Sequence, residues 1–371
     1  MSLLNADGNP MRYNNLGESG LMVSEVSFGT MTFSDVDQAA TGNGIGISSS
    51  EDAFIMMEAC FRGGVNFFDC AEGYGYAGAA ERVLGDAIQL GLARGTWDRM
   101  DLVISTKLHN GGRGDRDSIN SIGLSRKHLV EGMKASLARL QLDYVDLVFC
   151  HRPDPTTPMV EVVRAMNFLI DQGLAFYWGT SEWSAQMIEE ARGIAREGGP
   201  QMAPPIFEQV SYSMLLRDRV EIEHQRLYPQ LGLTAFAPLQ GGLLTGKYSS
   251  DPTTWPAEWR RAGRGDVQME SVKTAEALGP IAKALGCSIA QLAMAWCLTN
   301  QNVSTCLMGA SRLSQVQDNI GACRVARQLE GEGGAAVLAQ IEELLGNTPE
   351  PPRGAMASDY RVPVRRQSSR L

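Results

Sequence analysis

Four polar residues form the strongest chemical signal in this sequence, because each lies where a short apolar stretch ends. Asp69 and Tyr74 lie at and just beyond the end of one such stretch, and Lys107 and His151 close two others. A tyrosine has an ordinary pKa of about 10, which a neighbouring lysine ammonium lowers, while a carboxylate keeps the lysine charged. Asp69, Tyr74 and Lys107 could therefore form one acid-base unit, with His151 orienting a substrate carbonyl. This set suits protonation of a developing alkoxide while a cofactor supplies hydride.

Each of these residues also has a purely structural explanation. Asp69 could cap the next turn, and Lys107 could form a structural ion pair with it. Tyr74 could pack in its loop, and His151 could hydrogen-bond the turn-like residues that follow it. Their joint placement at the ends of three neighbouring stretches favours a functional site.

Apolar stretches alternate with amphipathic ones along most of the chain, as in repeated β-α units. Strands are predicted at 26–29, up to 69, and at 102–106, 145–150, 175–179, 205–209, 233–237 and 304–308. Helices are predicted at about 51–63, 78–91, 125–140, from 158, and at 184–196, 271–285, 288–299, from 312, and 335–346. The predicted fold is therefore α/β, a (β/α)8 TIM barrel whose functional groups lie at the carboxyl ends of the strands. An N-terminal β-hairpin at about 11–24 and extra C-terminal helices are expected to complete it.

We expect residues 1–348 to form this single barrel domain and residues 349–371 to form a flexible C-terminal tail. The tail opens with Pro-Glu-Pro-Pro and ends in the basic sequence RVPVRRQSSRL, so binding to an acidic surface is the alternative. Residues 37–50 are small, glycine-rich and polar, which predicts a mobile loop or insertion. Residues 240–266 are expected to form a long irregular segment.

The composition is that of a globular enzyme, with 371 residues of which 44% are hydrophobic and 20% charged. A net charge of −9 argues against general nucleic-acid binding. No apolar run approaches the roughly 20 residues that span a bilayer, and the first ten residues lack the pattern of a signal peptide. We therefore expect a cytoplasmic protein without membrane insertion. Seven cysteines without CxxC spacing predict packing residues rather than disulfides or a metal site.

Two glycine-containing loops are candidates for binding phosphate. Gly309-Ala310-Ser311-Arg312 follows the last predicted strand and opens a helix, and TIM barrels often bind phosphate after strands seven and eight. Ser311 and Arg312 could hold an additional phosphate, such as the 2′-phosphate of NADP. A second glycine run at 240–247 follows strand seven, but its spacing is not that of a Walker A motif, and no Rossmann GxGxxG stands in the right context.

Several longer segments resemble the aldo-keto reductase superfamily and, within it, the beta subunits of voltage-gated potassium channels. The resemblance runs from about residue 11 to residue 347. The most specific segments are LSRKHLVEGMKASL at 124–137, HRPDP at 151–155, YWGTSEWS at 177–184, AMAWCL at 293–298 and GAS at 309–311. The forms CHRPD and AFYWGTSEWSAQ look most like the plant-type members.

This resemblance implies a barrel that binds NADP(H) without a Rossmann fold and reduces carbonyl groups. It implies that Asp69, Tyr74, Lys107 and His151 are the catalytic tetrad, with Tyr74 as the general acid. The cofactor contacts that it implies are Thr30, Ser181, Glu182, Gln209, Phe236, Pro238, Leu239, Gly241, Lys247, Gly309, Ser311, Gln315, Asp318 and Asn319. Gln209 would address the nicotinamide carboxamide, and Ser311 with Gln315 the adenosine end.

Two departures from the animal beta subunits affect the expected function. Those proteins carry asparagine at the position of His151, where most active reductases carry histidine, so histidine favours catalysis here. Met31 stands where they usually have tryptophan, which leaves the substrate open. The leading hypothesis is an NADPH-dependent reductase of aldehydes and ketones. The alternative is a cytoplasmic, homotetrameric regulatory subunit that binds a potassium channel alpha subunit and uses NADP(H) as a redox sensor. A barrel that keeps the cofactor without chemistry is the third interpretation.

Overall fold

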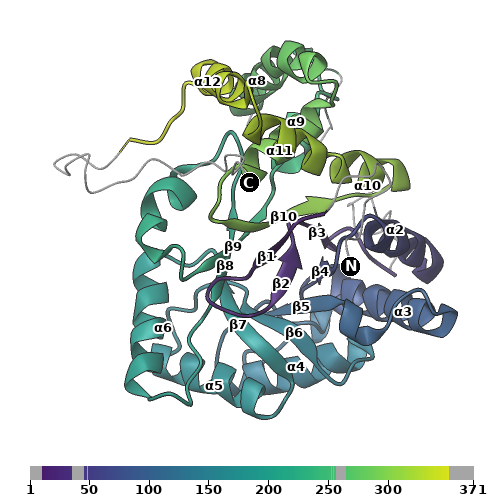
Figure 1. Cartoon of the computed structure of the whole chain (residues 1–371). Coiled ribbons are helices and arrows are strands. Elements are labelled where there is room, and N and C mark those ends of the chain that lie inside the picture. The colour runs from purple at the N-terminus through teal and green to yellow at the C-terminus, as the bar shows by residue number, and fades with distance from the viewer. Residues whose placement is uncertain are drawn as a thin grey trace.

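Eight parallel strands close into a barrel in this computed structural model, which describes residues 11–35, 46–47, 49–251, 253, 255 and 265–350. The barrel order is β10-β3-β4-β5-β6-β7-β8-β9, so neighbours in the chain are neighbours in the sheet and the last strand closes on the first. The strands are β3 (Val26–Gly29), β4 (Phe67–Asp69), β5 (Val103–Leu108), β6 (Val145–Cys150), β7 (Ala175–Ser181), β8 (Phe207–Ser211), β9 (Gly232–Phe236) and β10 (Val303–Gly309). The predicted (β/α)8 TIM barrel is confirmed (Figure 1).

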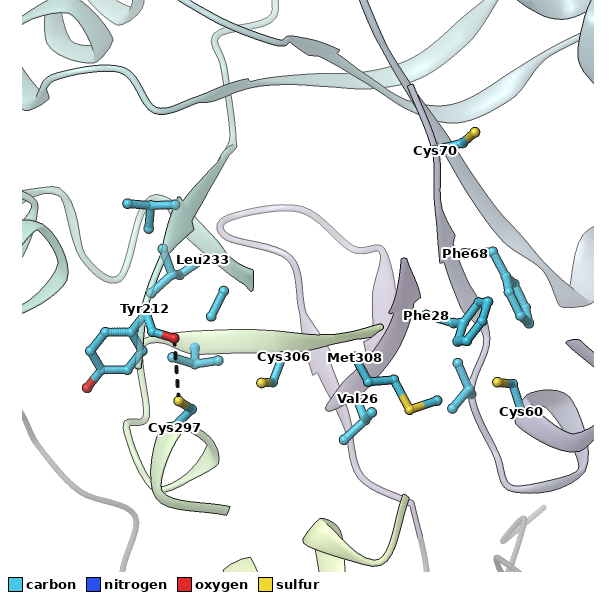
Figure 2. Packing of buried hydrophobic residues seen from close by; sticks show 14 of the residues in the cluster. Val26, Phe28, Cys60, Phe68, Cys70, Tyr212, Leu233, Cys297, Cys306 and Met308 are labelled. Atoms are coloured by element: carbon cyan, nitrogen blue, oxygen red, sulfur yellow. Dashed lines mark hydrogen bonds between the residues drawn. The ribbon is translucent and has the colours of Figure 1, made fainter. Parts of the chain in front are cut away.

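Every residue of β5 and β6 is buried, because a parallel strand in a barrel is covered on both faces. A small separate core forms between strand residues of the barrel and two residues of the N-terminal segment at 11–24. It is made of Leu16, Val23, Phe67, Val103, Leu147, Phe149 and Phe207. The outer faces pack against the helices in a larger core, part of which is seen in Figure 2, where Phe28, Phe68 and Met308 lie among cysteine side chains. All seven cysteines are free, and every one except the half-buried Cys287 is buried, as the prediction of packing residues requires.

Helices surround the barrel and begin at serine caps that the sequence already marks. Ser49, Ser125, Ser184 and Ser288 each accept a hydrogen bond from a backbone N–H in the first helical turn. The helices along the barrel are α2 (Ser50–Arg62), α3 (Ala79–Arg94), α4 (Arg126–Leu140), α5 (Met159–Asp171), α6 (Ala185–Glu197), α9 (Ile289–Leu298) and α10 (Leu313–Ile320). Between β8 and β9 the chain forms only a π-helical turn at Arg219–Glu223 and a 3-10 turn at Gln225–Leu227.

The predicted N-terminal hairpin closes the amino end of the barrel. Its strands β1 (Tyr13–Asn15) and β2 (Met22–Ser24) pair antiparallel and lie across the strand starts in Figure 1. Asn14 Nδ2 donates to the carbonyl of Ser304 at 2.8 Å. Gly17 has a φ of +58°, and a Cβ there would lie 2.3 Å from the carbonyl oxygen of Ile206. The chain therefore needs glycine at this turn. Because the hairpin covers the amino end of the barrel, a site is expected at the carboxyl end.

The extra C-terminal helices gather on one side of the barrel, as Figure 1 shows for α8 (Gly265–Ala284), α11 (Ala322–Glu330) and α12 (Gly334–Leu345). Glu342 ties α12 to its surroundings, because its carboxylate accepts from Arg217 Nη1 at 2.7 Å and from Trp296 Nε1 at 3.0 Å. The confirmed fold thus includes both the hairpin and these helices.

Parts of three predicted segments lie outside the described residues. These are most of the loop at 37–50, part of the irregular segment at 240–266, and all but the first two residues of the tail at 349–371. The domain limits therefore stay a prediction. Within the described part of the chain, no single helix is both long and apolar enough to cross a membrane. One bent pair of helices, Met269–Ala284 with Ile289–Leu298, is long and apolar enough when the two are taken together, by length and composition only.

Candidate active site

The strand register brings the four predicted catalytic residues to one end of the barrel. Asp69 closes β4 and pairs with Ser105 of β5, two residues before Lys107. Lys107 pairs with Phe149 of β6, and His151 follows the last residue of that strand. Because all barrel strands are parallel, these ends lie at the same edge. Their side chains are thus presented together at the carboxyl end.

A continuous hydrogen-bond chain joins three of the four residues. The Nζ atom of Lys107 donates to Oδ2 of Asp69 at 2.5 Å, to the Tyr74 hydroxyl at 3.0 Å and to the carbonyl of Cys70 at 2.8 Å. An ammonium group has three hydrogens, so all its donors are used. The Lys107 and Asp69 side chains are 0% and 1% exposed. The ion pair is therefore fully removed from water.

Asp69 is held on its other oxygen as well. Its Oδ1 accepts from Ser105 Oγ at 2.7 Å and from Gln209 Nε2 at 3.2 Å. Its backbone carbonyl accepts from the N–H and the hydroxyl of Thr30, each at 2.9 Å. These hydrogen bonds to the carboxylate and to the backbone carbonyl hold Asp69 in place. Asp69, which orients Lys107, is itself oriented by Ser105 of β5, by Gln209 of β8 and by Thr30 directly after β3.

The net pKa of Tyr74 differs from the sequence prediction. Burial raises the pKa of Tyr74, the positive charge of Lys107 lowers it to a smaller extent, and the negative charge of Asp69 raises it again. The lysine effect has the predicted sign, but loss of hydration outweighs it. Burial lowers the pKa of Lys107, yet Asp69 and Tyr74 together raise it above its ordinary value. At neutral pH the site therefore holds a protonated tyrosine beside a charged ammonium.

His151 lies against the tyrosine in a neutral state. The two rings meet edge to face, with centroids 5.6 Å apart at 79°. Burial, followed by the positive charges of Lys107 and Arg152, lowers the pKa of His151 to about 2. A neutral imidazole has one N–H to donate, so His151 can hold a carbonyl oxygen next to the Tyr74 hydroxyl.

Three further residues support the site although the sequence prediction passed over them. Ser105 binds Asp69, as described above. Arg152 Nη1 donates to the carbonyl of His151 at 2.6 Å and to Ser181 Oγ at 3.0 Å, which joins the ends of β6 and β7. Glu72 is fully buried in the turn before Tyr74. The sequence offered a signal for two of them. Glu72 is a charged residue inside an otherwise uncharged turn, and Ser105 lies two positions before Lys107 on the same face of its strand.

The predicted cofactor contacts on β7 and β8 lie beside this chain. Ser181 pairs with Gln209 in the sheet, and the Gln209 amide reaches Asp69. Glu182 has a φ of +59°, and its carboxylate accepts from Ser211 N at 2.8 Å and from Arg219 Nη1 at 2.7 Å. The charge of Glu182 is therefore already neutralised within the protein. Thr30, the predicted contact that directly follows β3, is fully buried.

The loop after β9 carries an unusual concentration of left-handed backbone. Ala237 and Gln240 have φ values of +54° and +48°, and Gly241 has +64°. Such residues cluster at ligand sites, since the surrounding structure must enforce them. A Cβ at Gly241 would have no atom within 4 Å, so this backbone faces open space. The other predicted contacts here are Phe236, which ends β9, and Pro238, Leu239 and the exposed Lys247 in the loop.

The loop after β10 places the remaining contacts around the start of α10. Ser311 N and Ser311 Oγ donate to Gln315 Oε1 at 2.8 and 3.2 Å, and Asn319 is buried in the same helix. Asp318 is directed elsewhere, because its carboxylate accepts from Ser288 Oγ at 2.8 Å. A Cβ at Gly309 would meet nothing within 4 Å.

The donors of these two loops fit a phosphate-bearing ligand. Arg312 is exposed at the N-cap of α10, and Lys247 is exposed after the glycine run. Neither side chain forms an ion pair with any residue in the described ranges. Two unneutralised cations, a helix amino terminus and two glycines facing open space can together receive anionic groups. No group of three His, Cys, Asp or Glu side chains within the described ranges could hold a metal ion.

Comparison with known proteins places the chain in a family. Residues 25–333 match the aldo/keto reductase family. A protein of Arabidopsis thaliana called "Probable voltage-gated potassium channel subunit beta" is 45% identical, over 92% of this chain and 99% of its own length. A protein of Oryza sativa subsp. japonica with the same name is 44% identical, over 92% of this chain and 98% of its own length.

Proposed function

Because this chain belongs to the aldo/keto reductase family, we propose that it is an NADPH-dependent reductase that converts aldehydes or ketones to alcohols. The observation that carries the proposal is the hydrogen-bonded chain of Asp69, Lys107 and Tyr74 beside the neutral His151. When bound, NADPH would supply the hydride for the carbonyl carbon. The remaining chemistry belongs to side chains of the protein.

Each of the four residues has a distinct part in this proposal. His151 donates its N–H to the carbonyl oxygen and orients the substrate. Tyr74 transfers its proton to the same oxygen as negative charge develops there. Lys107 donates to the tyrosine oxygen at 3.0 Å and so stabilises the phenolate that the transfer leaves. Asp69 keeps Lys107 charged and in place.

We propose that the cofactor lies across the carboxyl end between β8 and α10. Gln209 would bind the nicotinamide carboxamide, and Gly241 and Lys247 would approach the phosphates. Arg312 and Ser311 would take the 2′-phosphate. The two cations without ion pairs in the described chain support NADPH over a cofactor without that extra charge. The other proposed contacts are Thr30, Ser181, Glu182, Phe236, Pro238, Leu239, Gly309, Gln315, Asp318 and Asn319.

The experiment that tests the proposal follows cofactor absorbance while purified protein, NADPH and a panel of aldehydes and ketones react. Tyr74→Phe should lower kcat by about 10²- to 10⁴-fold, the usual contribution of a positioned general acid, and leave NADPH affinity nearly unchanged. Tyr144→Phe makes the same chemical change at the start of β6, at the opposite end of the barrel, and should keep wild-type turnover. Turnover that survives in Tyr74→Phe would remove the tyrosine from its assigned role.

The names of the two plant relatives favour a second candidate function. In it the protein is a cytoplasmic, homotetrameric regulatory subunit that binds a potassium channel alpha subunit and uses bound NADP(H) as a redox sensor. Light scattering would give the oligomeric state, and binding to the cytoplasmic part of an alpha subunit would be compared with and without NADPH. Tight NADPH binding without turnover of any carbonyl would favour this function over the first.

A further inference from the structure

The loop that follows β5 brings an asparagine side chain against His151. Asn110 Nδ2 lies 3.4 Å from His151 Nδ1, and Asn110 Oδ1 lies 2.8 Å from Nδ1 of His109. An amide oxygen only accepts, so Nδ1 of His109 must carry the proton in that short contact. In this arrangement the amide oxygen is directed at His109 and the amide N–H group faces His151.

A buried carboxylate holds this asparagine in place. Glu72 is 1% exposed, and its Oε1 accepts from the backbone N–H of His109 at 2.7 Å and from that of Gly111 at 3.1 Å. These are the residues on either side of Asn110. The same oxygen lies 2.9 Å from Nε2 of His128. Glu72 therefore clamps the loop on both sides of Asn110.

A close backbone approach sets the position of Asn110 more tightly. A Cβ at Gly73 would lie only 3.0 Å from Cβ of Asn110, so the asparagine rests directly on the turn that carries Tyr74. Gly111 has a φ of +75°, which turns the chain away immediately afterwards. Asn110 thus lies between the turn of Tyr74 and the ring of His151.

The hydrogen bond at one ring nitrogen of a neutral histidine decides the state of the other. His151 is neutral, because burial and the nearby positive charges lower its pKa to about 2. Donation from Asn110 requires Nδ1 to be unprotonated, which puts the single proton on Nε2. Nε2 of His151 has no hydrogen-bond partner within the described part of the chain, so its N–H is available to a ligand.

We propose that Asn110, clamped by Glu72, is a positioning residue that holds His151 in the tautomer with the proton on Nε2. In this tautomer His151 donates to the carbonyl oxygen that Tyr74 protonates. The catalytic consequence rests on the proposed reductase function, whereas the tautomer is a property of the free protein.

Nuclear magnetic resonance of the ring nitrogens tests the tautomer directly. The chain has four histidines, so labelling histidine with ¹⁵N gives few signals, and His151→Asn identifies those of His151. In the free wild-type protein at neutral pH we expect Nδ1 without a proton and Nε2 with one. Asn110→Asp keeps the side-chain size but can only accept, so it should move the His151 proton to Nδ1. Asn120→Asp adds the same charge to the same loop and should leave the His151 signals unchanged.

Measurement of kcat, and variants that release the Glu72 clamp, test the proposal in two further ways. Asn110→Asp should lower kcat about 100-fold, as when one donor to a developing oxyanion is lost, and leave NADPH affinity unchanged. Asn120→Asp should keep wild-type kcat. Glu72→Ala releases the loop and should give both tautomers of His151. Asn110→Ala leaves the Glu72 clamp intact and should also give both tautomers of His151. It therefore provides the test if Glu72→Ala fails to fold.

Two results would overturn the inference. One is a wild-type spectrum with the His151 proton on Nδ1, and the other is a set of His151 signals that do not move in Asn110→Asp. Moved signals with unchanged kcat would refute the catalytic consequence. A wild-type protein that shows the expected tautomer but reduces no carbonyl would contradict the reductase function and leave the positioning role standing.

Discussion

Replacing Lys107 by methionine tests the buried ion pair at the centre of the site. In the wild type, Nζ of Lys107 lies 2.5 Å from Asp69 Oδ2, and both side chains are almost fully buried. After the substitution Asp69 would keep two side-chain donors among the described residues, Ser105 Oγ and Gln209 Nε2. Removing one partner of a buried pair leaves an uncompensated charge, which costs about 3–5 kcal/mol of unfolding free energy. We expect Lys107→Met to lose about that much stability as well as its turnover.

A second substitution separates the ion pair from the rest of the site. The double variant Lys107→Met/Asp69→Asn removes both charges, and replacing both members of a buried pair is often close to neutral. The double variant should therefore regain most of the stability that Lys107→Met loses. Recovery of the unfolding free energy when Asp69→Asn is added to Lys107→Met would indicate that the two residues are energetically coupled.

The assay is urea unfolding followed by tryptophan fluorescence, since the chain has six tryptophans. Lys127→Met is the matched control, because Lys127 and Glu131 also lie 2.5 Å apart but are 57% and 63% exposed. Water screens that pair, so its loss should change the unfolding free energy little. A Lys107→Met protein as stable as Lys127→Met, or a double variant as unstable as Lys107→Met, would refute the argument from burial.

Two further predictions address the pH dependence of stability and the choice of cofactor. Burial raises the pKa of Glu208 to about 8, so the folded chain binds a proton between about pH 4.5 and 8 that the unfolded chain releases, and stability falls as pH rises through this window. Glu208→Gln should remove that fall, up to about 1.4 kcal/mol per pH unit; parallel unfolding curves for wild type and variant at pH 5, 6.5 and 8 would contradict it. Arg312→Ala should weaken NADPH binding more than NADH binding in a fluorescence titration, because only NADPH has the 2′-phosphate. Equal losses for both cofactors would reject that role for Arg312.

Local patterns in the sequence predicted the barrel well because each of its elements has a local cause. The mainly apolar run at 145–150 became β6 with the same limits, since a strand covered on both faces is rich in apolar residues. Its one charged residue, Asp146, accepts from Arg99 Nη2 at 2.7 Å and from Ile104 N at 2.8 Å. Ser125 was predicted at the start of a helix and is the N-cap of α4. The step between β8 and β9 offered no such pattern, and there the chain forms only short π and 3-10 turns.

The sequence by itself determined which chemical groups stand at the carboxyl ends of neighbouring strands, because local residue patterns predict where strands end and turns begin. The tertiary structure decided how those groups act on one another. Whether Lys107 or burial governs the pKa of Tyr74 depends on how much water the folded barrel excludes. The pairing of Glu182 with Arg219 joins residues 37 positions apart, and the contact of Asn110 with His151 joins residues 41 positions apart. Such contacts depend on loop paths in three dimensions, and no period or spacing along the chain encodes them.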